Sequence, residues 1–126
     1  MNVSGINLNL YDFNKINMDN IKPYDTITLN RLCKKTIEDI WSRFSQEDYS
    51  YWMLLCRERN DYTVFRLEDS QEEFYSALLE CLNNRGKVLD ITKQPDDNYE
   101  IWIKDSITGE NFAYYLFDYN NAIIEV

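Results

Sequence analysis

The sequence predicts an α+β fold in which two helices pack on a largely antiparallel sheet of about five strands. Three observations favour it. Two stretches carry apolar residues at helical spacing, several short apolar or aromatic runs are joined by turn-forming residues, and no repeat or linker divides the 126 residues. The expected order of elements is α-β-β-α-β-β-β. With 44% apolar residues the chain can bury one core, so we expect a single domain over residues 1–126.

The first helix is expected in the stretch TLNRLCKKTIEDIWSRFS, residues 28–45, where apolar residues recur at intervals of three and four. Thr28 or Asn30 is expected to cap its N-terminus. Residues 1–27 are rich in asparagine, and we expect a short strand and irregular structure there. The apolar stripe of the helix consists of Leu29, Leu32, Cys33, Ile37, Ile40, Trp41 and Phe44.

Two strands are then expected in YWMLLCRE and YTVFRLE, residues 51–58 and 62–68, joined around the polar pair Asn60-Asp61 as a hairpin. The second helix has the clearest signals. Ser70 followed by Glu73 is a capping box, and Gly86 lies where a helix commonly ends. Its apolar stripe consists of Phe74, Leu78, Cys81 and Leu82.

Three further strands are expected in KVLDITK, YEIWIKD and FAYYLFDY, separated by QPDD and ITGE, with AIIEV as a last strand or an extension. The strand at residues 112–119 is apolar on both faces. It is therefore either covered on both sides, or it packs on the helices with one face and offers the other to a partner. Alternation places Phe112, Tyr114 and Leu116 on one face, and Ala113, Tyr115, Phe117 and Tyr119 on the other.

Trp102 is a candidate anchor for a partner. Tyr99, Ile101 and Ile103 form the expected inward set of their strand, which leaves Trp102 on the same side as Glu100 and Lys104. A tryptophan among charges on an exposed strand face is typical of a binding hot spot. The alternative is a tryptophan at the rim of the sheet that the N-terminal segment covers.

The composition excludes several kinds of chemistry. The chain has no histidine, and it lacks a Cys-x-x-Cys pair, a glycine-rich phosphate loop and a calcium-loop pattern. The stretch DSITGEN, residues 105–111, fits a hairpin connection better than a calcium loop. Cys33, Cys56 and Cys81 each lie in an apolar pattern, as expected of reduced, buried thiols. We therefore expect no metal, no cofactor and no enzymatic activity.

No run approaches the about 18 apolar residues of a membrane span. The N-terminus also lacks the basic and apolar regions of a secretory signal, so we expect a cytoplasmic protein that does not bind membranes.

The charge is distributed unevenly. Residues 1–66 hold nine acidic and nine basic side chains, whereas residues 67–126 hold thirteen and four, which gives the whole net charge of −9. Such a surface repels nucleic acid and attracts basic proteins. We expect its carboxylates to take the place of phosphates, as in a DNA mimic, while Trp102 and a surface tyrosine anchor the contact. The expected partner-binding residues are Glu68, Asp69, Glu72, Glu73, Asp96, Asp97, Trp102, Asp105, Glu110 and Tyr115.

At CRERNDYTVF, NRGKVLDI, YEIWI and YYLFDYNNAIIEV the chain resembles small acidic proteins of phages and mobile elements of low-GC Gram-positive bacteria. Proteins of this kind include inhibitors of host defence, among them anti-CRISPR proteins. The resemblance implies a non-enzymatic inhibitor that blocks a nucleic-acid-binding effector in the cytoplasm of an infected or host bacterium. It covers roughly residues 51–126 and assigns no residue a role.

Two alternatives remain open from the sequence. An immunity protein that neutralises a basic toxin nuclease would use the same acidic surface on a different partner. A carboxylate-dependent enzyme or a small-ligand-binding domain would instead have a deep pocket that holds an Asp or Glu of raised pKa.

Overall fold

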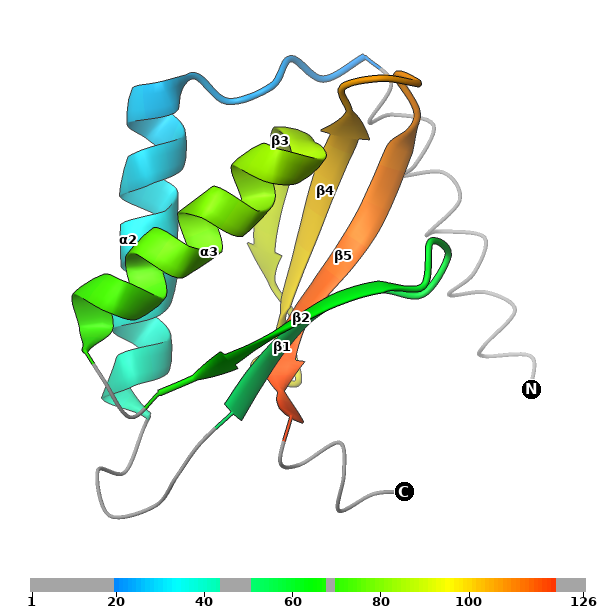
Figure 1. Cartoon of the computed structure of the whole chain (residues 1–126). Coiled ribbons are helices and arrows are strands. Elements are labelled where there is room, and N and C mark those ends of the chain that lie inside the picture. The colour runs from blue at the N-terminus through cyan, green and yellow to red at the C-terminus, as the bar shows by residue number, and fades with distance from the viewer. Residues whose placement is uncertain (1–19, 44–50, 68–69, 120–126) are drawn as a thin grey trace.

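The computed structural model describes residues 20–43, 51–67 and 70–119 (Figure 1). Its order of elements confirms the α+β fold and the expected α-β-β-α-β-β-β arrangement. Phe44, the stretch AIIEV and residues 1–19 lie outside the described residues. The elements are α2 (Thr26–Ser42), β1 (Tyr51–Cys56), β2 (Asp61–Arg66), α3 (Gln71–Arg85), β3 (Gly86–Lys93), β4 (Tyr99–Asp105) and β5 (Asn111–Asp118).

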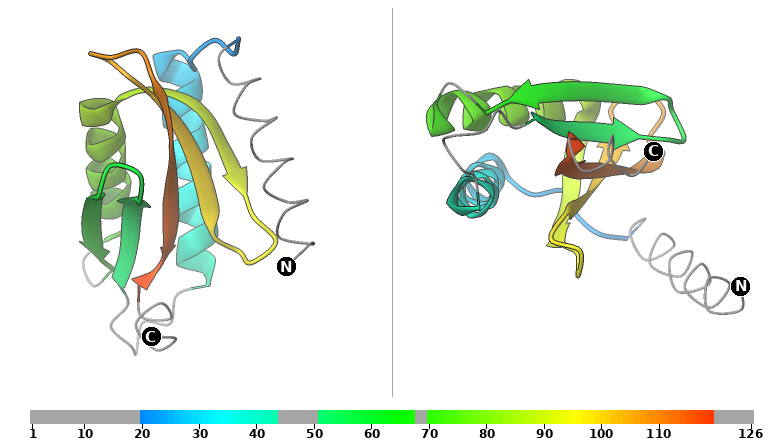
Figure 2. Two further views of the ribbon diagram at one scale, coloured as in Figure 1. Left: turned by 90° about the vertical axis from the view of Figure 1, so that its right-hand side faces the viewer. Right: turned by 90° about the horizontal axis from the view of Figure 1, so that it is seen from below.

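The five strands form one sheet in the order β2-β1-β5-β4-β3, and every neighbouring pair is antiparallel. The register shifts once, between Val88 and Asp90 of β3. The sheet is strongly twisted, and both helices lie on the same face of it (Figure 2). No helix in the described part of the chain is long and apolar enough to cross a membrane.

Helix α2 begins earlier than the sequence suggested. Asp25 is its N-cap, and the Oδ1 atom of Asp25 accepts a hydrogen bond from the backbone N–H of Thr28 at 2.7 Å. The expectation that Thr28 or Asn30 caps the helix is therefore wrong. An aspartate satisfies a free N–H group of the first turn as well as a hydroxyl does, and this bond also lowers the pKa of Asp25.

Helix α3 has the boundaries that the sequence signals. Ser70 Oγ accepts from the backbone N–H of Glu73 at 3.1 Å, and the N–H of Gly86 donates to the carbonyl oxygen of Leu82. Gly86 has φ +152°, and a Cβ atom there would lie 2.0 Å from the carbonyl oxygen of Lys104. Only glycine therefore allows the helix to turn directly into β3 beside β4.

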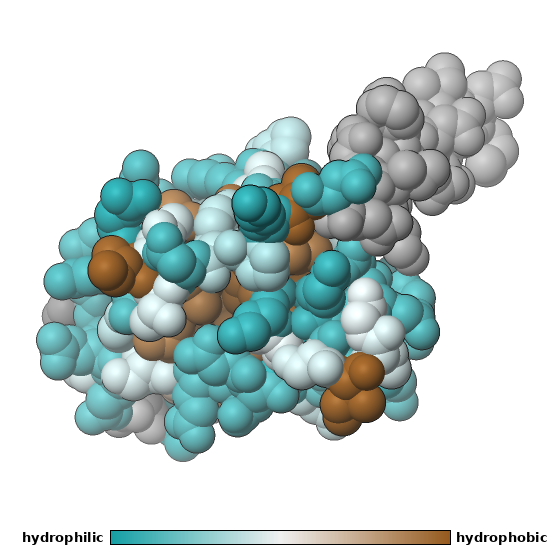
Figure 3. Space-filling view, turned by 90° about the horizontal axis from the view of Figure 1, so that it is seen from above, coloured by the Kyte–Doolittle hydropathy of each residue, from teal (hydrophilic) through white to brown (hydrophobic). Residues whose placement is uncertain are grey.

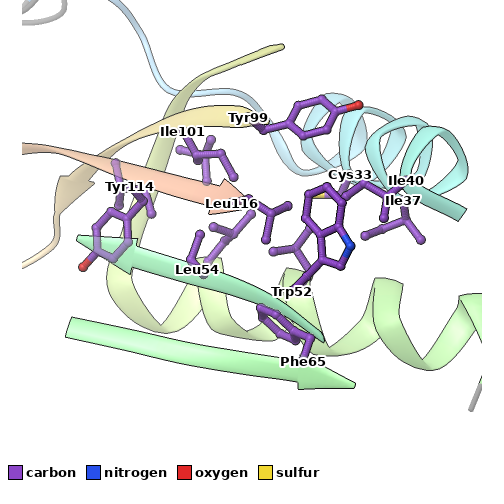
Figure 4. Close-up of a cluster of buried hydrophobic side chains, with 14 of the residues drawn as sticks. Cys33, Ile37, Ile40, Trp52, Leu54, Phe65, Tyr99, Ile101, Tyr114 and Leu116 are labelled. Carbon is purple, nitrogen blue, oxygen red and sulfur yellow. The ribbon is translucent and has the colours of Figure 1, made fainter. Parts of the chain in front are cut away.

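The core fills the space between the two helices and one face of the sheet (Figure 4). It confirms the alternation expected at residues 112–119, since Phe112, Tyr114 and Leu116 are all buried in it. Tyr99, Ile101 and Ile103 point inward as expected. The contribution of α2 consists of Leu29, Cys33, Ile37 and Ile40.

All three cysteines are free thiols. Cys33 and Cys56 are buried as expected, and burial raises the pKa of Cys33 to about 12 and also raises that of Cys56. Cys81 is only half-buried, so the expectation of complete burial is wrong for it. Its position in α3 is on the flank of the apolar stripe rather than at the centre, which Leu78 and Leu82 occupy.

Candidate functional site

The two faces of the sheet differ in what covers them. Helices α2 and α3 both lie on one face, so the opposite face has no helix on it among the described residues (Figures 1 and 2). The strand register assigns residues to that face. Met53 of β1 pairs with Val64 on one side and with Phe117 on the other, while its chain neighbours Trp52 and Leu54 point into the core.

Apolar and aromatic side chains of β2, β1 and β5 lie together on this second face, and we call them the sheet-face patch. Leu55 pairs with Tyr62 and with Tyr115 across the strands, next to the Met53 row, so the side chains are direct neighbours. Tyr62 is 59% exposed and Val64 is 41% exposed. The other members are half-buried. The patch consists of Met53, Leu55, Tyr62, Val64, Tyr115 and Phe117.

An open hollow of about 670 Å³ adjoins the patch. Leu55, Tyr115 and Phe117 form its apolar wall, and residues of the turn between β3 and β4, together with Arg57 of the β1–β2 turn, form its mostly polar rim. That turn is held by backbone hydrogen bonds, among them one from Gln94 N–H to the carbonyl oxygen of Asn98 at 2.7 Å. An apolar wall with a fixed polar rim is a suitable receptor for a protruding side chain of another protein. The rim consists of Arg57, Gln94, Pro95, Asp96 and Asn98.

Trp102 is not an exposed anchor. It lies on the face away from the helices, as expected from its spacing, but it is only 2% exposed. Its indole Nε1–H donates to Oε1 of Glu100 at 2.9 Å. The cross-strand neighbours of Trp102 are Ala113 and Asp90. The alternative that the N-terminal segment covers the ring concerns residues outside those that the structure describes. The expectation that this ring binds a partner is therefore corrected to a structural role.

Asp105 is also structural. It is 7% exposed, and its Oδ1 atom accepts from the backbone N–H groups of Ile107 and Thr108 at 2.8 and 2.9 Å. Its other carboxylate oxygen forms an ion pair with Arg59 at 2.8 Å. The turn hydrogen bonds lower its pKa, so Asp105 is ionised and fully engaged in closing the β4–β5 connection. A carboxylate held in this way is not available to replace a phosphate.

The other expected carboxylates are exposed but lie apart. Asp96 and Asp97 occupy the β3–β4 turn, whereas Glu110 occupies the β4–β5 turn at the opposite end of β4. The seven residues of β4 separate these turns by about 20 Å. The end with the β4–β5 turn is mostly hydrophilic, with apolar atoms only at separate points (Figure 3). Glu72 and Glu73 are exposed in the first turn of α3, and Glu68 and Asp69 lie outside the described residues.

A polar network lies on the helix-facing side, behind the patch, around the ring of Tyr114. The Tyr114 hydroxyl donates to Oδ2 of Asp61 at 2.7 Å, and Nη1 of Arg59 lies 3.4 Å from the Tyr114 oxygen. Arg85 binds the same aspartate in a bidentate manner, with Nε to Oδ2 at 2.7 Å and Nη2 to Oδ1 at 2.9 Å. Asp61 begins β2 and Arg85 ends α3, so the network fixes β2 on the helix.

The network stays in one charge state at neutral pH. The hydrogen bonds from Arg85 lower the pKa of Asp61, and the same bonds raise the pKa of Arg85. Burial raises the pKa of Tyr114 to about 12, so its hydroxyl remains a hydrogen-bond donor. No group in it can exchange a proton near neutral pH, and a fixed scaffold is the role that it supports.

A second cluster joins the end of α2 to β3 and β4. The Tyr99 hydroxyl donates to the carboxylate of Asp39, which also forms ion pairs with Arg43 at 3.1 Å and Lys93 at 3.2 Å. The hydrogen bond from Tyr99 contributes most to lowering the pKa of Asp39. Arg43 Nη1 also donates to the carbonyl oxygen of Asp97 at 2.8 Å. These contacts hold the turn that rims the hollow.

The described aspartates of these clusters are engaged in hydrogen bonds and ion pairs. Within residues 20–43, 51–67 and 70–119, no group of three or more cysteine, aspartate or glutamate side chains is arranged to hold a metal ion. Hydrogen bonds and ion pairs lower the pKa values of four aspartates, which are Asp25, Asp39, Asp61 and Asp105. Lowered values describe ionised, hydrogen-bonded carboxylates, which make poor general acids.

Tyr115 is the one expected partner-binding residue that lies in the patch. Sequence reasoning missed Met53, Leu55, Tyr62 and Val64. The available signal was that β1 and β2, like β5, are apolar on both faces, while only two helices are expected to cover them. No family model matches the chain, and neither a curated protein nor a solved structure matches it.

Proposed function

We propose that this protein is a non-enzymatic protein-binding inhibitor that docks on a basic, nucleic-acid-binding protein through the sheet-face patch. One observation carries the proposal. Apolar and aromatic side chains from three adjacent strands gather on a face that no described helix covers, with Tyr62 at 59% and Val64 at 41% exposure. Exposed, contiguous apolar surface with a polar rim is typical of protein interfaces.

The side chains of the patch suit a protein partner. Tyrosine is enriched among residues that dominate binding energy, because its ring offers a large contact area and few rotatable bonds. Tyr62 and Tyr115 flank Leu55, and the hollow beside Leu55 can receive a protruding side chain.

The net charge of −9 supports a basic partner. The exposed carboxylates lie at separate points of the described surface. Their main effect is therefore long-range electrostatic attraction, which speeds association with a basic protein. The apolar patch supplies the short-range contact. In this proposal the carboxylates attract the partner and the apolar patch makes the contact. The sequence instead suggested a DNA mimic, in which each carboxylate takes the place of a phosphate.

A defence effector is the partner that the resemblance to phage and mobile-element proteins suggests, and the protein would act on it in the bacterial cytoplasm. A toxin nuclease presents the same basic surface, so an immunity protein would use the same patch. The identity of the protein that binds in an affinity capture distinguishes an inhibitor of host defence from an immunity protein.

Affinity capture with matched variants tests the proposal. A Tyr62→Lys/Val64→Lys double variant places charges on the patch, whereas Ile107→Lys and Ile27→Lys change apolar residues that are 94% and 81% exposed elsewhere. Wild-type protein and the two single variants should retain a nucleic-acid-binding protein from bacterial lysate, identified by mass spectrometry. The double variant should lose it.

Purified partner then gives a second measurement. Binding should weaken as salt rises to physiological strength, and the partner should release its DNA or RNA when the inhibitor binds. Equal capture by the double variant and the single variants contradicts the proposed surface. Retention of no nucleic-acid-binding protein by the wild type contradicts the proposed function.

A further inference from the structure

The two edges of the sheet are not equivalent. At the β3 edge, the segment before α2 lies against the strand, where Tyr24 N–H donates to the carbonyl oxygen of Val88 at 2.9 Å. The Tyr24 hydroxyl also reaches Oδ1 of Asp90 at 3.4 Å. At the other edge, β2 pairs with β1 on one side, and no described strand pairs with its second side (Figure 2). Half of its backbone N–H and C=O groups therefore point outward.

Strand β2 lacks the features that usually protect an edge. Its six residues, DYTVFR, contain no proline and no lysine, and its register with β1 is continuous over the whole strand. The charges are confined to its ends. Asp61 is neutralised by Arg85, and Arg66 lies over the ring of Tyr51 at 5.9 Å. The four residues between them are regular, uncharged strand that can pair with another strand.

Different side chains flank this edge on its two sides. On the uncovered face lie Tyr62 and Val64 of the sheet-face patch. On the other side lies α3, which contacts β2 through Phe74, whose ring is 5.4 Å from that of Phe65.

Helical spacing places Glu73 and Glu80 beside this contact. Arg85 and Phe74 lie on the same side of α3, and both contact β2. Going around the helix from that side, Ala77 comes next and the two glutamates follow it. Both glutamates are exposed. A strand added beside β2 would therefore meet apolar side chains on one face and carboxylates on the other.

We propose that the edge of β2 with which no described strand pairs accepts an extended segment of the partner, in which lysine or arginine alternates with apolar residues. The inference rests on the proposed function and adds the binding mode. Main-chain hydrogen bonds to β2 would supply affinity, while the alternation of side chains would supply specificity. The apolar residues would lie beside Tyr62 and Val64, and the basic residues beside Glu73 and Glu80.

A second copy of this chain is a poorer occupant of the same edge. Each copy carries a net charge of −9. Antiparallel pairing of two β2 strands about a two-fold axis would also bring the glutamate-bearing flanks of both α3 helices together. Like charges facing each other across an interface oppose association.

A synthetic peptide tests the pairing. The probe is a heptapeptide of alternating lysine and valine. One control peptide has the same composition, but its lysines and valines are segregated. A second control is the alternating peptide with every other backbone nitrogen methylated. We expect the alternating peptide to bind, to shift the amide signals of Tyr62–Phe65 in NMR spectra and to slow their hydrogen exchange. The methylated and segregated peptides should bind at least about tenfold more weakly.

Charge reversal on the protein provides the matched control. The Glu73→Lys/Glu80→Lys variant should weaken peptide binding about tenfold. The Glu38→Lys/Glu110→Lys variant makes the same change in net charge at exposed positions on α2 and in the β4–β5 turn, and it should change peptide binding much less. Unchanged dispersion of the NMR spectra confirms that both variants are folded.

Equal binding of the methylated peptide, or equal losses in the two charge variants, would mean that the peptide only adsorbs to an acidic protein, and the inference would be wrong. No binding of the alternating peptide would also overturn it. The proposed function is judged separately, because capture of a nucleic-acid-binding protein through the sheet-face patch can succeed whether or not the peptide pairs with β2.

Discussion

Replacement of Trp102 by alanine distinguishes a structural ring from a binding anchor. Trp102 is 2% exposed on the face of the sheet opposite the helices. A buried tryptophan removes about 150–250 Å² from water, which at about 25 cal/mol per Å² corresponds to about 4–6 kcal/mol. Large-to-small substitutions in protein cores destabilise by about 3–5 kcal/mol when the cavity partly collapses, and we expect a value in this range for Trp102→Ala.

Equilibrium unfolding in urea, followed by circular dichroism, measures this loss. Because small domains are stable by only about 5–15 kcal/mol, the alanine variant is expected to unfold at much lower urea concentration. Trp102→Phe provides a milder variant. It retains most of the apolar area and loses the hydrogen bond to Glu100, so we expect a loss of about 1–2 kcal/mol with the affinity of the folded protein unchanged.

The opposite pattern would refute the reasoning. If Trp102→Ala leaves the urea midpoint unchanged while it weakens partner binding by about tenfold or more, the ring acts at the interface. In that case Trp102 would belong to the binding surface, and the extent of its burial in the free protein would not describe the bound state.

The remaining predictions concern cysteine reactivity and pH. Cys81 should react first with a thiol reagent in the native protein, because it is half-buried whereas the other two cysteines are fully buried; simultaneous labelling of all three, measured by mass spectrometry, would contradict this. Asp61 has a lowered pKa in the folded protein, so its contribution to stability is complete above its unfolded pKa of about 4 and is lost as pH falls below it. Thermal unfolding should therefore depend less on pH between about 5 and 2 in Asp61→Asn than in the wild type, and identical slopes would argue against this contribution.

The sequence determined the elements whose signals lie within a few residues of one another. Ser70 and Gly86 fixed the ends of α3, and turn residues separated the strands, because caps and turns depend on local hydrogen bonds and backbone angles. Alternation in β5 correctly assigned Phe112, Tyr114 and Leu116 to the core. The cap of α2 was misplaced because aspartate, threonine and asparagine are nearly equivalent in that role, and Asp25, Thr28 and Asn30 lie within one and a half turns.

Only the tertiary structure decided which surface the described helices leave uncovered. Spacing placed Trp102 on the correct face, but spacing cannot show how much of the ring is exposed to solvent. The pairing of Asp61 with Arg85, 24 residues later, depends on how α3 crosses the sheet. Whether α2 and α3 share one face or divide between two is a property of the connections between elements, and it creates the sheet-face patch. Burial and long-range pairing depend on contacts between distant parts of the chain, and local patterns do not specify those contacts.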